Sequence, residues 1–136
     1  MAQNFNQSEK LQSKLSPQDW GSMEWLVDDS LVKGTGMSVA VMTLLKGKTS
    51  PLHRHPNCHE FIYLVEGKVE VSLDEKKVVL ETGDSVLNPL GTIHGVRNLG
   101  AGDAKMVISY SQGARVYEEV EGNNGKEPNE GQFKGI

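Results

Sequence analysis

Three observations predict an all-β fold of antiparallel strands. Between residues 20 and 117, short apolar runs are separated at close intervals by Gly, Pro and Asp, which is typical of a β-sandwich or β-barrel. These runs are rich in Val, Ile, Leu and aromatic residues, as strands usually are. No long stretch of the region shows the 3.6-residue period of an amphipathic helix. We therefore expect about eight short strands in a closed or two-sheet β architecture.

The expected strands follow one another through tight connections. They cover residues 22–27, 37–45, 60–65, 69–73, 78–80, 85–87, 95–98 and 104–110. The Glu-Gly-Lys segment at 66–68 and the Asp-Glu-Lys-Lys segment at 74–77 have the composition of hairpin turns. Gly83 can adopt a positive φ in the turn before residue 85. Pro89 and Gly91 lie in the connection between the strands expected at 85–87 and 95–98.

Both ends of the chain differ in composition from the middle. We predict a polar N-terminal arm over 1–19, a β domain over 20–117 and a flexible polar tail over 118–136. In the arm, Ser16 is interpreted as an N-cap and Pro17 as the first position of a short helical turn. The acidic tail contains too little apolar surface to offset its ordering entropy, so we expect it to be solvated and disordered.

The overall composition excludes several classes of protein. A chain of 136 residues is the usual size of one domain, and its net charge of -4 provides no basic surface for nucleic acid. No apolar stretch approaches the ~18 residues of a membrane span, and the first ten residues lack the apolar core of a signal peptide. Cys58 is the single cysteine and cannot form an intrachain disulfide. We expect a soluble, cytoplasmic protein.

The distribution of histidines suggests a metal site. The four histidines are His53, His55, His59 and His94. Side chains at i and i+2 of an extended strand point to the same face, so His53 and His55 can face one point while Arg54 faces away. Glu60 follows a predicted Pro-Asn bend that could turn its carboxylate toward the same point. His94 would then complete a site of mixed nitrogen and oxygen donors.

Such donors suit Fe(II), Mn(II), Ni(II), Cu(II), Co(II) or Zn(II), whereas Ca(II) prefers oxygen ligands alone. The spacing by itself leaves two alternatives open. A His-x-His pair can also be an exposed polar stretch. His59 shares its parity with His53 and His55, so it is an alternative to Glu60 as a ligand.

Two segments resemble the two conserved motifs of the cupin superfamily. The first reads Gly47, five residues, His53-Arg54-His55, four residues, Glu60, six residues, Gly67. The second reads Gly83, five residues, Pro89-Leu90-Gly91, two residues, His94, three residues, Asn98. Every specified position of both motifs is filled, and the spacer between the motifs is short, as in compact microbial cupins.

This resemblance implies an antiparallel jelly-roll barrel, also called a double-stranded β-helix, with one divalent metal ion at the bottom of an open pocket. It implies four metal ligands, namely His53, His55, Glu60 and His94, and so favours Glu60 over His59. The resemblance also implies turn roles for Gly47, Gly67, Gly83, Pro89 and Gly91, and a structural role for Asn98. Similar proteins often form homodimers through their terminal strands.

The function implied is that of a small-molecule metalloenzyme, either a dioxygenase or a redox-neutral lyase or isomerase. Glu60 could shuttle a proton in addition to binding the metal. The alternative is a non-catalytic module that binds or senses a sugar or an organic acid, because one fold hosts many functions. A purely structural metal site is disfavoured, since such sites have closed coordination.

Other residues are given structural roles. Ile62 and Leu64 share the face of the predicted glutamate ligand and should line the barrel, with Tyr63 on the opposite face. Arg97 is interpreted as a solvated strand charge rather than an anion anchor, and Cys58 as a small packing residue rather than a reactive thiol. A further set is expected in the core rather than in contact with substrate, namely Trp25, Met42, Met106 and Tyr110.

Overall fold

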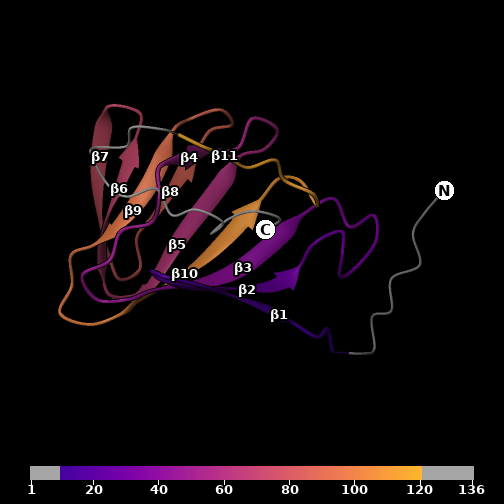
Figure 1. The fold of residues 1–136 in the computed structure, drawn as a ribbon, viewed down its shortest axis with the longest axis horizontal. Helices are drawn as coiled ribbons and strands as arrows, with labels where there is room; N and C mark the ends of the chain where they lie inside the picture. Colours follow the sequence, from indigo (N-terminus) through magenta and orange to yellow (C-terminus); the bar gives the residue numbers. More distant parts are fainter. Residues whose placement is uncertain (1–9, 121–136) are drawn as a thin grey trace.

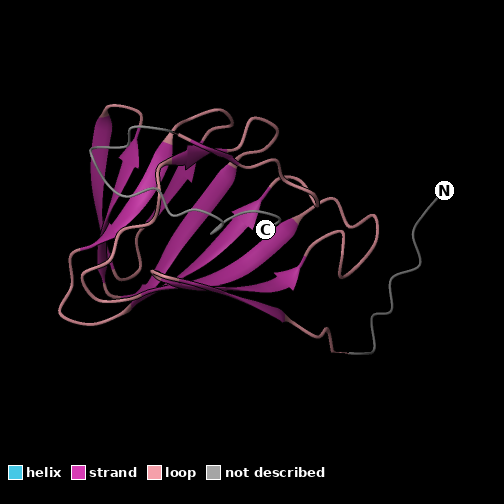
Figure 2. Cartoon of the chain, in the orientation of Figure 1, coloured by secondary structure: helices cyan, strands magenta, loops and turns pink. Residues whose placement is uncertain are grey.

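The computed structural model describes residues 10–120, which form strands and loops without a helix (Figures 1 and 2). The strands are β1 (Lys14–Gln18), β2 (Gly21–Val27), β3 (Ser38–Leu44), β4 (His53–Arg54), β5 (Glu60–Glu66), β6 (Lys68–Leu73), β7 (Lys76–Glu81), β8 (Ser85–Asn88), β9 (His94–Asn98), β10 (Ala104–Tyr110) and β11 (Glu118–Glu119). Accordingly, no helix within these residues is long and apolar enough to cross a membrane.

The strands form two antiparallel sheets. One sheet has the order β1-β2-β3-β10-β5-β8, and the other has the order β11-β4-β9-β6-β7. Figure 1 shows β6, β7 and β9 on one side of the molecule and β1, β2 and β3 on the other. Most neighbours in these sheets are far apart in sequence, as β10 lies between β3 and β5. Pairing of this kind places segments that are far apart in the sequence side by side in one sheet.

The core lies between the inner faces of the two sheets. In β3 and β10, buried side chains alternate with more exposed ones, as expected for strands with one face in the core. Met42 is directly opposite Met106, and Ile108 is directly opposite Ile62. Val69 of β6 contributes from the other sheet. The inner faces therefore form one apolar cluster, with a polar group of side chains near one end.

Each of the eight predicted strands is confirmed, with bounds that differ by one or two residues at most. Ile62 and Leu64 are fully buried, while Tyr63 on the opposite face is 42% exposed, as predicted. The predicted core positions on β2, β3 and β10 are also buried. The alternation of apolar and polar residues was therefore sufficient to assign both strands and faces.

The predicted helical turn at the N-terminus is wrong. Residues 14–18 form β1, and Pro17 lies opposite Ser22 of β2. Because β1 is the edge of its sheet, it pairs on one side only, and a Pro without an N–H is tolerated there. The Ser-Pro sequence satisfies the rules for a helix start, but pairing with β2 decides its conformation.

Two observed strands, β1 and β11, were not predicted, and β4 was expected only as the extended segment that carries His53 and His55. β1 lies in the predicted arm and β11 in the predicted tail, so strands occur beyond both proposed boundaries of the β domain. The disorder expected after Tyr117 falls mainly on 121–136, which lie outside the described residues. β4 and β11 are two residues long and pair with each other, so neither has a periodic pattern of its own.

Asn98 has the structural role that was expected of it. Its side-chain Nδ2 donates to the carbonyls of Leu44 at 2.9 Å and Gly102 at 3.0 Å. Its Oδ1 accepts a hydrogen bond from the Gly100 N–H at 2.8 Å. This buried side chain thus joins β9 to the end of β3 and to the loop before β10.

Candidate metal centre

Three segments bring the four predicted ligands together. His53 lies in β4, and His55 follows directly after it. A turn at residues 56–57 then reverses the chain before β5, which begins at Glu60. His94 begins β9 and lies directly opposite His53 in the antiparallel pair. The four side chains are therefore placed by strand ends on both sheets.

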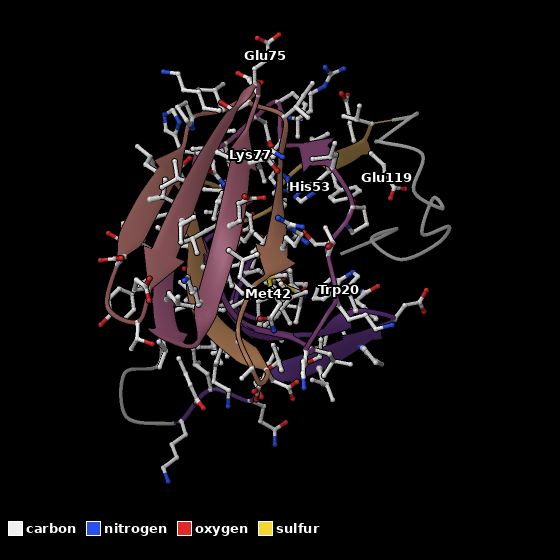
Figure 3. All side chains as sticks on the ribbon, turned by 90° about the vertical axis from the view of Figure 1, so that its left-hand side faces the viewer. Trp20, Met42, His53, Glu75, Lys77 and Glu119 are labelled. Atoms are coloured by element: carbon white, nitrogen blue, oxygen red, sulfur yellow. The ribbon has the colours of Figure 1, made fainter. Side chains whose placement is uncertain are left out.

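The four side chains form one compact buried cluster. Each offers a ligand atom, and these atoms all lie within 4.8 Å of one another. The ring centroids of His53 and His94 are 4.4 Å apart, and those of His53 and His55 are 4.9 Å apart. Figure 3 shows His53 on the side of Glu119, above Met42 and Trp20. The cluster could hold a metal ion, and all four predicted ligands belong to it.

Backbone carbonyls hold all three imidazoles in the same tautomer. Each ring places Nδ1 near one backbone carbonyl. The distances are 2.8 Å from His53 to Pro51, 2.8 Å from His55 to Val116, and 3.0 Å from His94 to Thr92. A carbonyl only accepts hydrogen bonds, so Nδ1 must be the donor in each ring. Each neutral ring therefore carries its lone pair on Nε2, the nitrogen suited to metal binding. Hydrogen bonds of this kind commonly orient metal-binding histidines.

Glu60 faces Nε2 of two of these rings. Its Oε1 accepts a hydrogen bond from Nε2 of His94 at 2.9 Å when that ring is protonated on both nitrogens, and it lies 3.1 Å from Nε2 of His55. The contact with His55 does not satisfy the direction of a hydrogen bond, so this buried Nε2 has no hydrogen-bond partner in residues 10–120. Two nitrogen lone pairs and a carboxylate repel one another unless a proton or a metal cation lies among them. This donor set therefore fits a divalent cation.

The cluster shifts the pKa values of its members in directions that follow from this arrangement. Burial, with the neighbouring His94 and His55, holds the pKa of His53 well below its ordinary value, so His53 stays neutral. Burial opposes the charge of Glu60, but His94 and His55 outweigh burial and lower the pKa of Glu60 well below its usual range. Burial likewise lowers the pKa of His94, but the adjacent carboxylate reverses this and raises it. The shifts of Glu60 and His53 thus favour the forms that bind metal, a carboxylate and a neutral imidazole, whereas His94 holds a proton that a bound metal would replace.

The structure places the two residues that spacing left open in different surroundings. Glu60 is buried in the cluster, whereas His59 is exposed and lies outside it. Nδ1 of His59 accepts a hydrogen bond from the Leu90 N–H at 3.0 Å, so this ring supports the loop after β8. Arg54 faces away from the cluster, as predicted, and pairs with Glu118 at 2.8 Å.

The remaining polar residues singled out in the sequence lie elsewhere. Arg97 has a half-exposed side chain that lies 3.5 Å from Glu70, which fits a solvated strand charge. Cys58 is buried, and burial raises the pKa of its thiol to about 11. Neither residue belongs to the cluster.

Sequence reasoning missed the segment that follows β10. Val116 supplies the carbonyl for His55, and the ring of Tyr117 stacks on His53 with centroids 4.7 Å apart. Glu119 of β11 then lies opposite His53 of β4 in an antiparallel pair of strands. A carbonyl belongs to every residue, so no sequence signal could have revealed its role. The segment containing Val116, Tyr117 and β11 thus contacts and orients His53 and His55.

The fold and the cluster together define a class of two-sheet β proteins that can hold one metal ion between their sheets. The family model for the cupin domain matches residues 40–110, which is more than half of the chain. This chain therefore belongs to the cupin family, which confirms the resemblance seen in the two motifs.

Several characterised proteins resemble this chain. It is 31% identical over 91 residues to the polyketide synthase CurC of Streptomyces cyaneus, covering 67% of this chain and 59% of that protein. It is 42% identical over 52 residues to quercetin 2,3-dioxygenase of Bacillus subtilis (strain 168), covering 38% and 15%. The chain thus spans about three fifths or less of the length of these relatives.

Solved structures confirm the fold class. An S161A mutant of Bacillus subtilis oxalate decarboxylase superposes with a TM-score of 0.71 at 19% identity, covering 79% of this chain and 30% of that one. Lactobacillus farciminis oxalate decarboxylase gives a TM-score of 0.73 at 18% identity, covering 79% and 33%. The predicted cupin-type jelly-roll fold is therefore correct.

Proposed function

We propose that this chain is a metal-dependent enzyme that acts on a small organic molecule, with His53, His55, Glu60 and His94 as its metal ligands. The observation that carries this proposal is the buried cluster itself, in which two imidazoles place Nε2 within 3.1 Å of one carboxylate and a third imidazole lies beside them. Maintaining four such groups in an apolar interior is costly unless a cation compensates them.

A transition metal ion bound by these residues would supply Lewis-acid or redox chemistry. Four protein donors leave up to two positions of a six-coordinate ion, so the centre differs from a closed structural site. The protein's own contribution is to fix the three imidazole tautomers through backbone carbonyls and to shield the centre from bulk water through burial.

Two reaction classes fit this centre. A dioxygenase is supported by the similarity to a protein described as quercetin 2,3-dioxygenase. A redox-neutral lyase or isomerase, which needs only a Lewis acid and a proton carrier, fits the same four ligands. In either case, Oε1 of Glu60 is the atom that would hold or release a proton, because it already lies within 3.1 Å of both His55 and His94.

The first experiment measures metal content by elemental analysis after purification from metal-supplemented medium. We expect about one transition metal ion per chain, and a sharp loss of metal in His94→Ala. His59→Ala is the matched control, because His59 is a nearby exposed histidine outside the cluster. Wild-type protein without stoichiometric metal, or equal metal content in the two variants, would contradict the proposal.

The second experiment separates catalysis from binding. Dioxygen uptake and substrate loss are measured for the metal-loaded protein with catechols, thiols and keto acids. Turnover that is lost in His94→Ala and kept in His59→Ala supports the enzyme. Saturable binding of sugars or organic acids with no turnover of any tested compound favours the alternative, a binding or sensing module.

The homodimer implied by the resemblance is proposed here through the edge strand β1. This strand pairs with β2 only, which leaves its other edge without a strand partner in the described part of the chain. Leu15 on β1 is 63% exposed. An exposed edge of this kind is a ready template for pairing with another copy. Light scattering after size-exclusion chromatography should give the mass of a dimer for the full chain and of a monomer for Leu15→Asp; a monomeric wild type would refute this arrangement.

A further inference from the structure

The side chain of Asn88 is buried beside the candidate metal centre without a hydrogen-bond partner. It is 1% exposed, and neither Nδ2 nor Oδ1 has a partner among residues 10–120. An amide buried in this state lacks the hydrogen bonds that it makes with water, so a ligand that supplies them is favoured. Asn88 ends β8, directly opposite Glu60 of β5. The unsatisfied amide therefore lies next to the carboxylate of the centre.

Asn88 belongs to a row of three buried polar side chains across adjacent strands. Tyr110 of β10 is opposite Glu60, which is in turn opposite Asn88. All three face the interior. Adjacent strands are about 4.8 Å apart, so the backbones at Tyr110 and Asn88 are about 10 Å apart with Glu60 between them. The two flanking side chains thus bracket the carboxylate on both sides.

On the Tyr110 side of this row lies a cation that has no carboxylate partner among residues 10–120. The guanidinium of Arg115 lies 3.9 Å from the ring centroid of Trp25 and 5.0 Å from that of Tyr110. None of the ion pairs in the described residues involves Arg115, and its buried Nε has no hydrogen-bond partner. The Tyr110 ring is in turn 5.2 Å from that of His55. Arg115 is therefore one side-chain layer from the centre.

We propose that Asn88 and Arg115 determine substrate specificity, and that the substrate is a small organic anion with a hydroxyl or carbonyl group at its other end. Arg115 would bind the carboxylate, since a guanidinium offers several N–H donors and pairs with carboxylates. The amide of Asn88 can donate to a carbonyl or accept from a hydroxyl. This inference rests on the proposed function, because it assigns the molecule that the metal centre would act upon.

The aromatic rings around Arg115 and the amide of Asn88 suggest the probes. 4-Hydroxybenzoate carries a carboxylate and a hydroxyl at opposite ends of one ring. 4-Hydroxybenzamide is its neutral counterpart, and benzoate lacks the hydroxyl. Binding to the metal-loaded protein is measured by calorimetry, which is independent of turnover. We expect 4-hydroxybenzoate to bind at least about tenfold more tightly than 4-hydroxybenzamide, which loses a hydrogen bond to a charged group, and about two- to tenfold more tightly than benzoate, which loses a neutral hydrogen bond.

Two variants test the two ends of the ligand separately. Arg115→Met keeps an unbranched side chain over Trp25, and should remove the preference for hydroxybenzoate over hydroxybenzamide. Asn88→Leu should instead remove the preference for hydroxybenzoate over benzoate. Arg97→Met is the matched control, because Arg97 has a half-exposed side chain beside Glu70 and should leave both preferences unchanged. Arg115→Lys keeps the positive charge and serves as a second variant if Arg115→Met folds poorly. It should retain part of the preference for hydroxybenzoate over hydroxybenzamide.

The outcomes distinguish this inference from the proposed function. If the protein binds no transition metal, the proposed function fails. If it binds metal but the wild type shows no preference for the anion, or if Arg115→Met behaves as Arg97→Met does, the assignment of Asn88 and Arg115 fails alone. Loss of metal from Asn88→Leu or Arg115→Met would also overturn it, because these residues would then support the metal rather than select a substrate.

Discussion

The segment after Arg115 should control metal affinity without supplying a ligand. Its carbonyl at Val116 lies 2.8 Å from Nδ1 of His55, and Tyr117 stacks on His53 at 4.7 Å. A chain that ends at Arg115 loses both contacts and β11, whereas a chain that ends at Val120 keeps them all. This pair of truncations therefore isolates the contribution of residues 116–120.

The expected magnitude follows from the two contacts. Removal of a hydrogen bond that orients a metal-binding histidine typically lowers metal affinity by about 10–100-fold, or about 1.4–2.7 kcal/mol. Loss of an aromatic pair adds about 0.5–1.5 kcal/mol. The dissociation constant for metal should therefore rise by about 25–1000-fold in the chain that ends at Arg115. Tyr117→Leu in the full chain removes only the stacked ring, so its effect should be about tenfold or less.

Competition with a chromophoric chelator measures these constants, and circular dichroism confirms that each chain is folded. The chain that ends at Val120 should match the full chain. If the folded chain that ends at Arg115 binds metal as tightly as the chain that ends at Val120, the bracing role of this segment is refuted. If that chain does not fold, an unchanged dissociation constant in Tyr117→Leu would still contradict the contribution of the stacked ring.

Three further predictions concern the fold and the thiol. Asn98→Ala removes three side-chain hydrogen bonds and should lower the free energy of unfolding by about 2–4 kcal/mol in urea denaturation. Gly21 has a φ of 152°, and a Cβ there would collide with the Thr43 carbonyl, so Gly21→Ala should cost more than about 2 kcal/mol. Gly102→Ala meets no atom within 4 Å, and an equal cost there would refute that explanation. Cys58 has a pKa of about 11 because of burial, so its reactive thiolate forms only as pH rises toward that value. Alkylation of the metal-free protein at pH 8 should be at least about a hundredfold slower than that of the unfolded chain, and rapid alkylation would contradict this environment.

Local pattern was sufficient for most of the fold and for the four residues of the centre. Strands such as β3 and β10 are long enough to show alternation, which assigns both the element and its buried face. The short strands β4 and β11 have no such signal, because each owes its conformation to its partners. Pro17 also shows that local sequence is insufficient where pairing decides the conformation. Its neighbours permit a helix start, but the segment pairs with β2 and is a strand.

The sequence by itself determined that this chain is an all-β cupin and that His53, His55, Glu60 and His94 belong to one site, because strand periodicity and motif spacing are local. The expected cytoplasmic location rests on composition alone and stays a prediction. Only the tertiary structure placed Val116 and Tyr117 against the histidines, Asn88 opposite Glu60, and Arg115 against Tyr110. These contacts join strands and loops that are distant in the chain. The role of a carbonyl or a buried amide depends on the side chains that it contacts, and these contacts exist only in the folded chain.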